Sequence, residues 1–240
     1  MNLYSIMKYH RISFVDLKTQ EETIKSALEG RLRIRGNIPI TGRSMTNYSI
    51  QLFPDISSSK LLSNVEDKDY MDVACGINHL YRESLLSKLA GTHKKHGLDI
   101  HDLEESKGSC KYHQGSAYNT KFSDNSYDLI TVNNFMYLWE LDADKLLKLY
   151  KEFHRILRSG GELRVFPVFY GNYSRNNVEL HEYLNTHFAI RCLRPVRDYS
   201  KEPPVYLEDD VIKKGVAGHG KNEHSKYTTL MAHVAIFTCL

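Results

Sequence analysis

The segment from Asp72 to Asn78 has the residue types of a ligand-binding turn. It reads Asp-Val-Ala-Cys-Gly-Ile-Asn and follows an apolar stretch that predicts a β-strand. Small residues between a strand and a helix let a ligand approach the backbone, and the first N–H groups of the helix can bind an anionic atom. We expect this turn to bind a ligand that carries a carboxylate. The alternative is an ordinary strand-to-helix connection.

A second acidic residue, Asp99, lies at the end of the next predicted strand, in the run Gly97-Leu98-Asp99. A carboxylate at this position can accept hydrogen bonds from both hydroxyls of a ribose, as it does in dinucleotide-binding folds. Its alternative role is to cap the helix that follows. The Gly-x-Gly-x-x-Gly pattern of NAD-binding enzymes is absent, which argues against a dehydrogenase.

A parallel sheet is expected to position these residues, because short apolar stretches alternate with helical segments from Asp69 onward. The apolar stretches predict strands at 69–74, 95–100, 110–113, 127–132 and 162–168. Two later apolar runs, 188–193 and 229–237, predict an antiparallel pair at the sheet edge. Together these stretches predict a doubly wound α/β sheet of seven strands.

Helical spacing identifies the segments between the strands. The first strand is followed by a predicted helix that carries Tyr81, Leu85 and Leu89. The fifth strand is preceded by a crossover helix with apolar residues at helical spacing, ended by a glycine pair: Leu146, Tyr150, Phe153 and Leu157, then Gly160-Gly161. Residues 1–60 are expected to form a cap or lid with a helix near 19–29, and residues 61–240 the ligand-binding domain.

The chain from 69 to 168 resembles the class I S-adenosylmethionine-dependent methyltransferases in four motifs that occur in the same order. Residues 72–78 resemble the first motif, usually Asp-x-Gly-x-Gly-x-Gly, and Asp99 resembles the ribose-binding acid. The segments 115–117 and 122–130 are similar to the stretch that binds adenine, and 154–163 to the segment leading into the fifth strand. The resemblance implies a Rossmann-like methyltransferase fold with S-adenosylmethionine as methyl donor and S-adenosylhomocysteine as product.

Three residues depart from the family pattern. Ala74 and Asn78 replace the first and third glycines, and Ser116 replaces an aspartate. Alanine adds little bulk, asparagine tolerates a positive φ, and a serine hydroxyl can still bond the adenine amine. The resemblance therefore implies cofactor contacts at Asp72, Ala74, Cys75, Gly76, Asn78, Asp99, Ile100, Ser116, Ala117 and Asn133. We interpret the Cys75 thiol as a packed group and not as a nucleophile, and Ser116 has an alternative role as a turn residue.

Methyl transfer from a sulfonium is an in-line displacement, so orientation matters more than a general base. The acceptor is expected near the carboxyl ends of the fourth and fifth strands. Candidate substrate contacts are Tyr137, Tyr170, Tyr173, Arg43 and Tyr48. We also expect Arg43, Asn47 and Tyr48 to close over the amino-acid end of the cofactor, although an ordinary surface loop is an alternative.

Composition restricts the class of partner. Lys and Arg total 32 against 29 Asp and Glu, and a net charge of +3 does not indicate a nucleic-acid partner. The four cysteines have no metal-ligand spacing, and no apolar run approaches the length of a membrane span. We expect a cytoplasmic enzyme acting on a small molecule or peptide, with no DNA and no membrane partner. The alternative is a non-catalytic binding or scaffolding protein with a degenerate methyltransferase-like fold.

Overall fold

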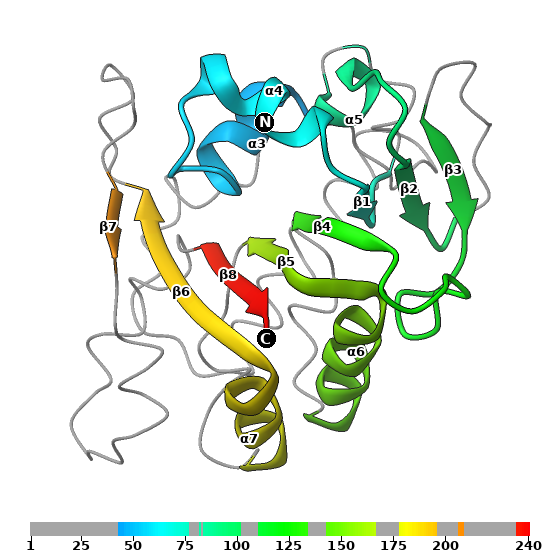
Figure 1. Cartoon of the computed structure of the whole chain (residues 1–240), viewed down its shortest axis with the longest axis vertical. Coiled ribbons are helices and arrows are strands. Elements are labelled where there is room, and N and C mark those ends of the chain that lie inside the picture. The colour runs from blue at the N-terminus through cyan, green and yellow to red at the C-terminus, as the bar shows by residue number, and fades with distance from the viewer. Residues whose placement is uncertain are drawn as a thin grey trace, which may run out of the picture.

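The computed structural model describes residues 43–76, 82, 84–101, 110–133, 143–166, 178–195, 206–208 and 234–240. They form an eight-stranded sheet in the order β3-β2-β1-β4-β5-β8-β6-β7 (Figure 1). The strands are β1 Tyr70–Val73, β2 Lys95–Asp99, β3 Lys111–Gln114, β4 Tyr127–Asn133, β5 Leu157–Phe166, β6 Phe188–Pro195, β7 Tyr206–Glu208 and β8 Val234–Cys239. The helices are α3 Met45–Gln51, α4 Ser58–Glu66, α5 Leu85–Lys88, α6 Ala143–Ile156 and α7 Val178–His187.

The sheet topology confirms the predicted fold class. Strands β3, β2, β1, β4 and β5 are parallel neighbours, and β8 pairs antiparallel with both β5 and β6. The expected pairing of the two late strands is therefore confirmed for β8 at Val234–Cys239, and residues 229–233 of the predicted run lie outside the described residues. A short strand, β7, pairs antiparallel with β6 and adds an eighth strand to the seven expected.

The glycine pair before the fifth strand does not end the crossover helix, contrary to our expectation. Helix α6 ends at Ile156, and Gly160-Gly161 lies within β5. The register between β4 and β5 shifts there, from Tyr127 opposite Leu157 to Leu129 opposite Glu162. Gly160 has a φ of +77°, which favours glycine, so the pair allows an irregularity in the strand.

The helix after the first strand is also shorter than predicted in the described part of the chain. Helix α5 begins after Ser84, whose hydroxyl accepts a hydrogen bond from the Ser87 N–H at 3.1 Å. Leu89 lies just after the helix in an extended conformation. Tyr81 and the predicted helix near 19–29 lie outside the described residues.

Helices cover both faces of the sheet (Figure 1). Helices α6 and α7 lie on one side, and α3, α4 and α5 on the other. Adjacent residues of a central strand therefore enter opposite cores: Ile130 packs with Phe153 and Tyr150, whereas Leu129 packs in the core that includes residues of α3 and α4. Burial on both faces explains why β4 carries apolar residues at successive positions, Leu129 and Ile130.

The segment containing α3 and α4 is tied to the sheet by a buried arginine. The Arg164 side chain of β5 is 4% exposed and donates to both carboxylate oxygens of Asp55, at 2.6 and 3.1 Å. It also donates to the Leu52 carbonyl at 3.1 Å and lies over the Phe53 ring. Helix α4 runs across the expected boundary between residues 60 and 61, so the described part of the cap is continuous with the sheet domain.

A buried lysine fixes the other end of α4. The Lys95 ammonium of β2 donates to the carbonyls of Glu66 and Lys68, at 2.7 and 2.5 Å. A cation at the carboxyl end of a helix satisfies carbonyls that have no partner within the helix. Within the described residues, no helix is long and apolar enough to cross a membrane.

Candidate cofactor-binding site

The turn after β1 has the backbone conformation expected of a glycine-rich motif. Ala74 and Gly76 both have positive φ values, 54° and 52°. Left-handed backbone costs a residue with a Cβ roughly 1–2 kcal/mol, so Ala74 occupies a position where glycine would be unstrained. The Cys75 N–H between them donates to the Leu98 carbonyl at 3.1 Å, which ties the turn to the end of β2.

The Asp99 carboxylate faces this turn from the end of β2. One oxygen accepts from the Gly76 N–H at 2.9 Å, and the other accepts from the His101 N–H at 3.1 Å. A carboxylate offers about four acceptor positions, so both oxygens can accept a further hydrogen bond. The next residue, Ile100, is 66% exposed and offers apolar surface just after the end of β2.

Close packing beneath the turn accounts for Cys75. A Cβ added at Gly97 would lie 2.8 Å from the Cys75 Sγ and 3.1 Å from Leu86. Burial, with smaller contributions from Asp72 and Asp99, raises the pKa of the Cys75 thiol well above its usual value. The thiol is therefore a buried packing group, as we interpreted it from the sequence.

The turn after β3 adjoins the same site. The Gly115 N–H donates to the Asp99 carbonyl at 2.8 Å. The Ser116 carbonyl accepts from the Asn119 N–H, and its hydroxyl accepts from the Tyr118 N–H at 3.3 Å. Ser116 thus has the local contacts of a turn residue, while its hydroxyl proton remains a potential donor. Ala117 is buried and packs in the core that contains Val132 and Leu98.

The Asp72 carboxylate contacts the cap helix α3 and the strand β4. The carboxylate is fully buried and accepts hydrogen bonds from the Tyr48 hydroxyl of α3 and from the Thr131 hydroxyl of β4, the latter at 2.9 Å. The Tyr70 hydroxyl lies 2.7 Å from the Thr131 hydroxyl and extends the network. Arg43 lies within electrostatic range of both Asp72 and Tyr48.

Two of the residues expected in the cap, Arg43 and Tyr48, therefore lie beside Asp72 of the first motif. Burial, followed by the charge of Asp72, raises the pKa of Tyr48 well above its usual value, so the phenol stays protonated and donates. Burial lowers the pKa of Arg43, while Tyr48 and Asp72 oppose that shift. Tyr48 is fully buried, and its hydroxyl contacts Asp72.

A second polar contact joins the same helix to β4. The Asn133 amide is buried and donates to the Gln51 side-chain carbonyl at 3.1 Å. We did not select Gln51 or Thr131 from the sequence. Their signals were positional: Gln51 lies three residues after Tyr48 on one helical face, and Thr131 is a polar residue between the apolar Ile130 and Val132.

The remaining predicted contacts are not described by the structure. Asn78, Tyr137, Tyr170 and Tyr173 lie outside the described residues, as does the side chain of Asn47. The described residues bring together Ala74, Gly76, Asp99, Ile100 and Ser116 at the carboxyl ends of β1, β2 and β3. Asp72, Asn133, Arg43 and Tyr48 form the adjoining contact with the cap.

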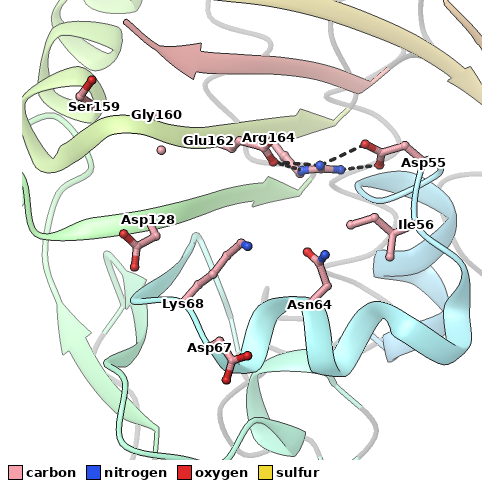
Figure 2. Close-up of a pocket in the computed structure, with 11 residues that line it drawn as sticks. Asp55, Ile56, Asn64, Asp67, Lys68, Asp128, Ser159, Gly160, Glu162 and Arg164 are labelled. Atoms are coloured by element: carbon pink, nitrogen blue, oxygen red, sulfur yellow. Dashed lines mark hydrogen bonds and ion pairs between the residues drawn. The ribbon is translucent and has the colours of Figure 1, made fainter.

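A hollow of about 660 Å³ lies between the cap and the sheet, away from this turn (Figure 2). Asn64 and Lys68 line it from the α4 side, and Asp128 and Glu162 from β4 and β5. Asp128 is at the start of β4, whereas the candidate site lies where the strands end. Three of its carboxylates have arginine partners: Asp128 pairs with Arg158, and Asp55 and Glu162 pair with Arg164. The hollow is therefore distinct from the candidate site.

Residues 71–165 match the family model described as a methyltransferase domain. Similar solved structures include a SAM-dependent methyltransferase from Thermotoga maritima, 18% identical, with 72% of this chain and 82% of that chain covered and a TM-score of 0.37. A SAM-dependent methyltransferase from Methanosarcina mazei is 15% identical, with 72% and 91% covered and a TM-score of 0.36.

Another similar structure is phosphoethanolamine N-methyltransferase 2 from Haemonchus contortus, in complex with phosphomonomethylethanolamine and S-adenosylhomocysteine. It is 16% identical, with 95% of this chain and 60% of that chain covered and a TM-score of 0.45. No curated protein matches the chain significantly. These structural likenesses are remote, and the assignment rests on the family model. Residues 71–165, which run from β1 into β5, are thus similar to a methyltransferase domain.

Proposed function

We propose that the protein transfers a methyl group from S-adenosylmethionine to a small-molecule or peptide acceptor by in-line displacement. One observation carries the proposal. The Asp99 carboxylate, at the end of β2, bonds the Gly76 N–H of a left-handed turn at the end of the neighbouring strand β1. An acceptor for hydroxyls and a turn with accessible backbone thus lie side by side.

The hydrogen-bonding groups at this site suit the chemistry of the cofactor. We assign the ribose hydroxyls to the free acceptor positions of Asp99, and the amino-acid end to the backbone of residues 74–76 with Asn78. The adenine lies, in this proposal, against the exposed Ile100 side chain, with the Ser116 hydroxyl and the Ala117 backbone at its edge. These residues come from three adjacent strand ends, so they can contact one extended ligand together.

The transfer step requires the chain to orient two reactants. The acceptor lone pair forms a bond to the methyl carbon while the carbon–sulfur bond breaks and its electrons stay on sulfur, giving S-adenosylhomocysteine. Well-oriented intramolecular reactions show effective molarities on the order of 10⁵ M or more, so positioning alone supplies much of the acceleration. We assign acceptor contacts to Tyr137, Tyr170 and Tyr173, with Arg43 and Tyr48 holding the cap beside the first motif.

Transfer of a labelled methyl group tests this function. The protein is incubated with labelled S-adenosylmethionine and separate extract fractions of small metabolites and of peptides, with Asp99→Asn as the matched control. We expect label in at least one fraction with the wild type and a large reduction with the variant. Binding of S-adenosylhomocysteine without transfer to any fraction would instead support the scaffolding function.

We further propose that the acceptor is not DNA and that the enzyme works in the cytoplasm. The small net charge of +3 provides little electrostatic attraction to a polyanion. Cys75, Cys110 and Cys239 are buried free thiols, which suits a reducing compartment. Cell fractionation tests the location, and recovery of the protein from the secreted fraction would contradict it.

A further inference from the structure

Two buried contacts connect one face of α3 to the strands that flank the cofactor turn. The Tyr48 hydroxyl donates to Asp72, and the Gln51 side-chain carbonyl accepts from the Asn133 amide at 3.1 Å. Asp72 lies two residues before Ala74, and Asn133 is the last residue of β4, the neighbour of β1. The helix therefore bonds side chains at the ends of both strands.

The Asp72 carboxylate depends on these donors because it is fully buried. A buried carboxylate must be hydrogen-bonded, and removing one partner costs more than the bond itself contributes, since the remaining charge stays desolvated. Tyr48 and Thr131 donate hydrogen bonds to this carboxylate, and Arg43 supplies a favourable charge nearby. Loss of the Tyr48 hydroxyl would therefore favour a shift of Asp72, and with it of the turn that follows.

We propose that Tyr48 and Gln51 are positioning residues, through which the docking of α3 holds Asp72 and Asn133 in the geometry that binds the cofactor. The inference rests on the proposed function, because it concerns affinity at the same site. Tyr48 acts through Asp72 and not by touching the cofactor. Because coupling between two events is reciprocal, cofactor binding also strengthens the docking of α3.

The segment has an independent anchor, so the contact can be tested without detaching it. The bidentate ion pair between Asp55 and Arg164 and the bond from Arg164 to the Leu52 carbonyl lie beyond the carboxyl end of α3. Removing one hydroxyl from Tyr48 leaves these contacts in place. We therefore expect Tyr48→Phe to fold with α3 less firmly held against Asp72.

Isothermal calorimetry with S-adenosylhomocysteine, using the full chain, measures the effect. Tyr127→Phe is the matched control, because Tyr127 is equally buried and its hydroxyl bonds His96 Nδ1 at 2.5 Å, at the opposite end of the sheet from the turn. We expect Tyr48→Phe to raise Kd about tenfold, since hydrogen bonds to charged groups are the stronger ones, and Tyr127→Phe to change Kd less than about twofold.

Hydrogen exchange of the α3 amides distinguishes a positioning role of Tyr48 from a contribution to overall stability alone. Saturating S-adenosylhomocysteine should slow exchange of the α3 amides in the wild type and in Tyr127→Phe, and much less in Tyr48→Phe. Gln51→Met removes the side-chain carbonyl that accepts from Asn133 and keeps a side chain of similar length. It should also weaken the affinity for S-adenosylhomocysteine. This second variant decides the matter if Tyr48→Phe does not fold.

Three outcomes would overturn the inference. The first is a Kd for Tyr48→Phe, or for Gln51→Met if the former does not fold, that equals the wild-type value. The second is equal weakening by Tyr48→Phe and Tyr127→Phe, which would indicate a general loss of stability. The third is no effect of the ligand on exchange of the wild-type α3 amides. If the wild type does not bind the ligand at all, the proposed function fails first, and the two failures are thus distinguished.

Discussion

The buried guanidinium of Arg164 makes several contacts between the cap and the sheet, so its removal should be costly. It bonds both oxygens of Asp55, at 2.6 and 3.1 Å, as well as Glu162 and the Leu52 carbonyl, and lies 4.6 Å from the centroid of the Phe53 ring. Removing one partner of a buried pair typically costs about 3–5 kcal/mol because the other charge remains desolvated. We expect Arg164→Met to lose about this much stability.

Urea unfolding followed by circular dichroism measures this loss, and thermal unfolding provides a second measure. For a domain of this size a loss of about 3–5 kcal/mol lowers Tm by roughly 6–20 °C. Lys151→Met is the control: its pair with Glu179 is 49% and 71% exposed, so its loss should cost less than about 1 kcal/mol. Adding Asp55→Leu to Arg164→Met should restore part of the stability, because no buried charge then remains unpaired. Arg164→Met within about 1 kcal/mol of wild type would refute this account of the cap.

Three further predictions concern the site and the sheet. Asp99→Asn should weaken S-adenosylhomocysteine binding at least about tenfold in calorimetry. Asp99→Ala should in addition lower the free energy of unfolding in urea by about 1–2 kcal/mol, because two backbone N–H groups lose their acceptor. Equal affinity in the wild type and both variants would contradict the ribose role. Gly97→Ala should destabilise by about 1–3 kcal/mol through contact with the Cys75 Sγ, and Cys75→Ala in the same chain should relieve part of that loss; no change on adding it would count against the packing. Burial, followed by the charges of nearby residues, lowers the pKa of His96 from 6.5 to about 4. Below pH 6.5 the unfolded chain therefore binds a proton at His96 more readily than the folded chain does, and the free energy of unfolding falls as the pH decreases toward 4. His96→Gln should lose about 1–3 kcal/mol less over that interval in urea titrations, and an unchanged pH dependence would show that another group is responsible.

The parallel half of the sheet could be predicted from the sequence because its signals are local. Short strand-like stretches alternate with helical segments, and the structure places β1 at Tyr70–Val73 and β2 at Lys95–Asp99, within one residue of the predicted bounds at each end. The short strand β7 could not be predicted, because three residues carry no periodic pattern and the pairing with β6 is set by long-range packing.

The prediction that Gly160-Gly161 ends the crossover helix was wrong for a different reason. Glycine after a helix is a common stop signal, yet Gly160 uses its positive φ inside a strand, where the register with β4 shifts. The sequence offered a competing signal that we did not use: Leu157 completes the helical spacing but also begins the strand.

The cap contacts show the limit of sequence reasoning most clearly. Tyr48 and Arg43 were selected as residues near the cofactor, and the structure places both beside Asp72. Their partner could not be deduced, because contact between α3 and β1 depends on how the helix docks and not on spacing along the chain. A signal existed for Arg164, a charge between the apolar Leu163 and Val165, which implies a buried partner.

The central claim is that the turn after β1 binds S-adenosylmethionine, and thermal unfolding with added ligand tests it most directly. A ligand that binds only the folded state adds about 2.7 kcal/mol at a hundredfold excess over Kd, which for this chain raises Tm by roughly 5–10 °C. We expect S-adenosylmethionine and S-adenosylhomocysteine to produce this shift and NADH and ATP to produce much less. Gly76→Val should abolish it, because a branched side chain is strained at a φ of 52° in the turn whose N–H bonds Asp99. An unmoved wild-type melting curve at millimolar concentrations of both ligands would contradict the claim.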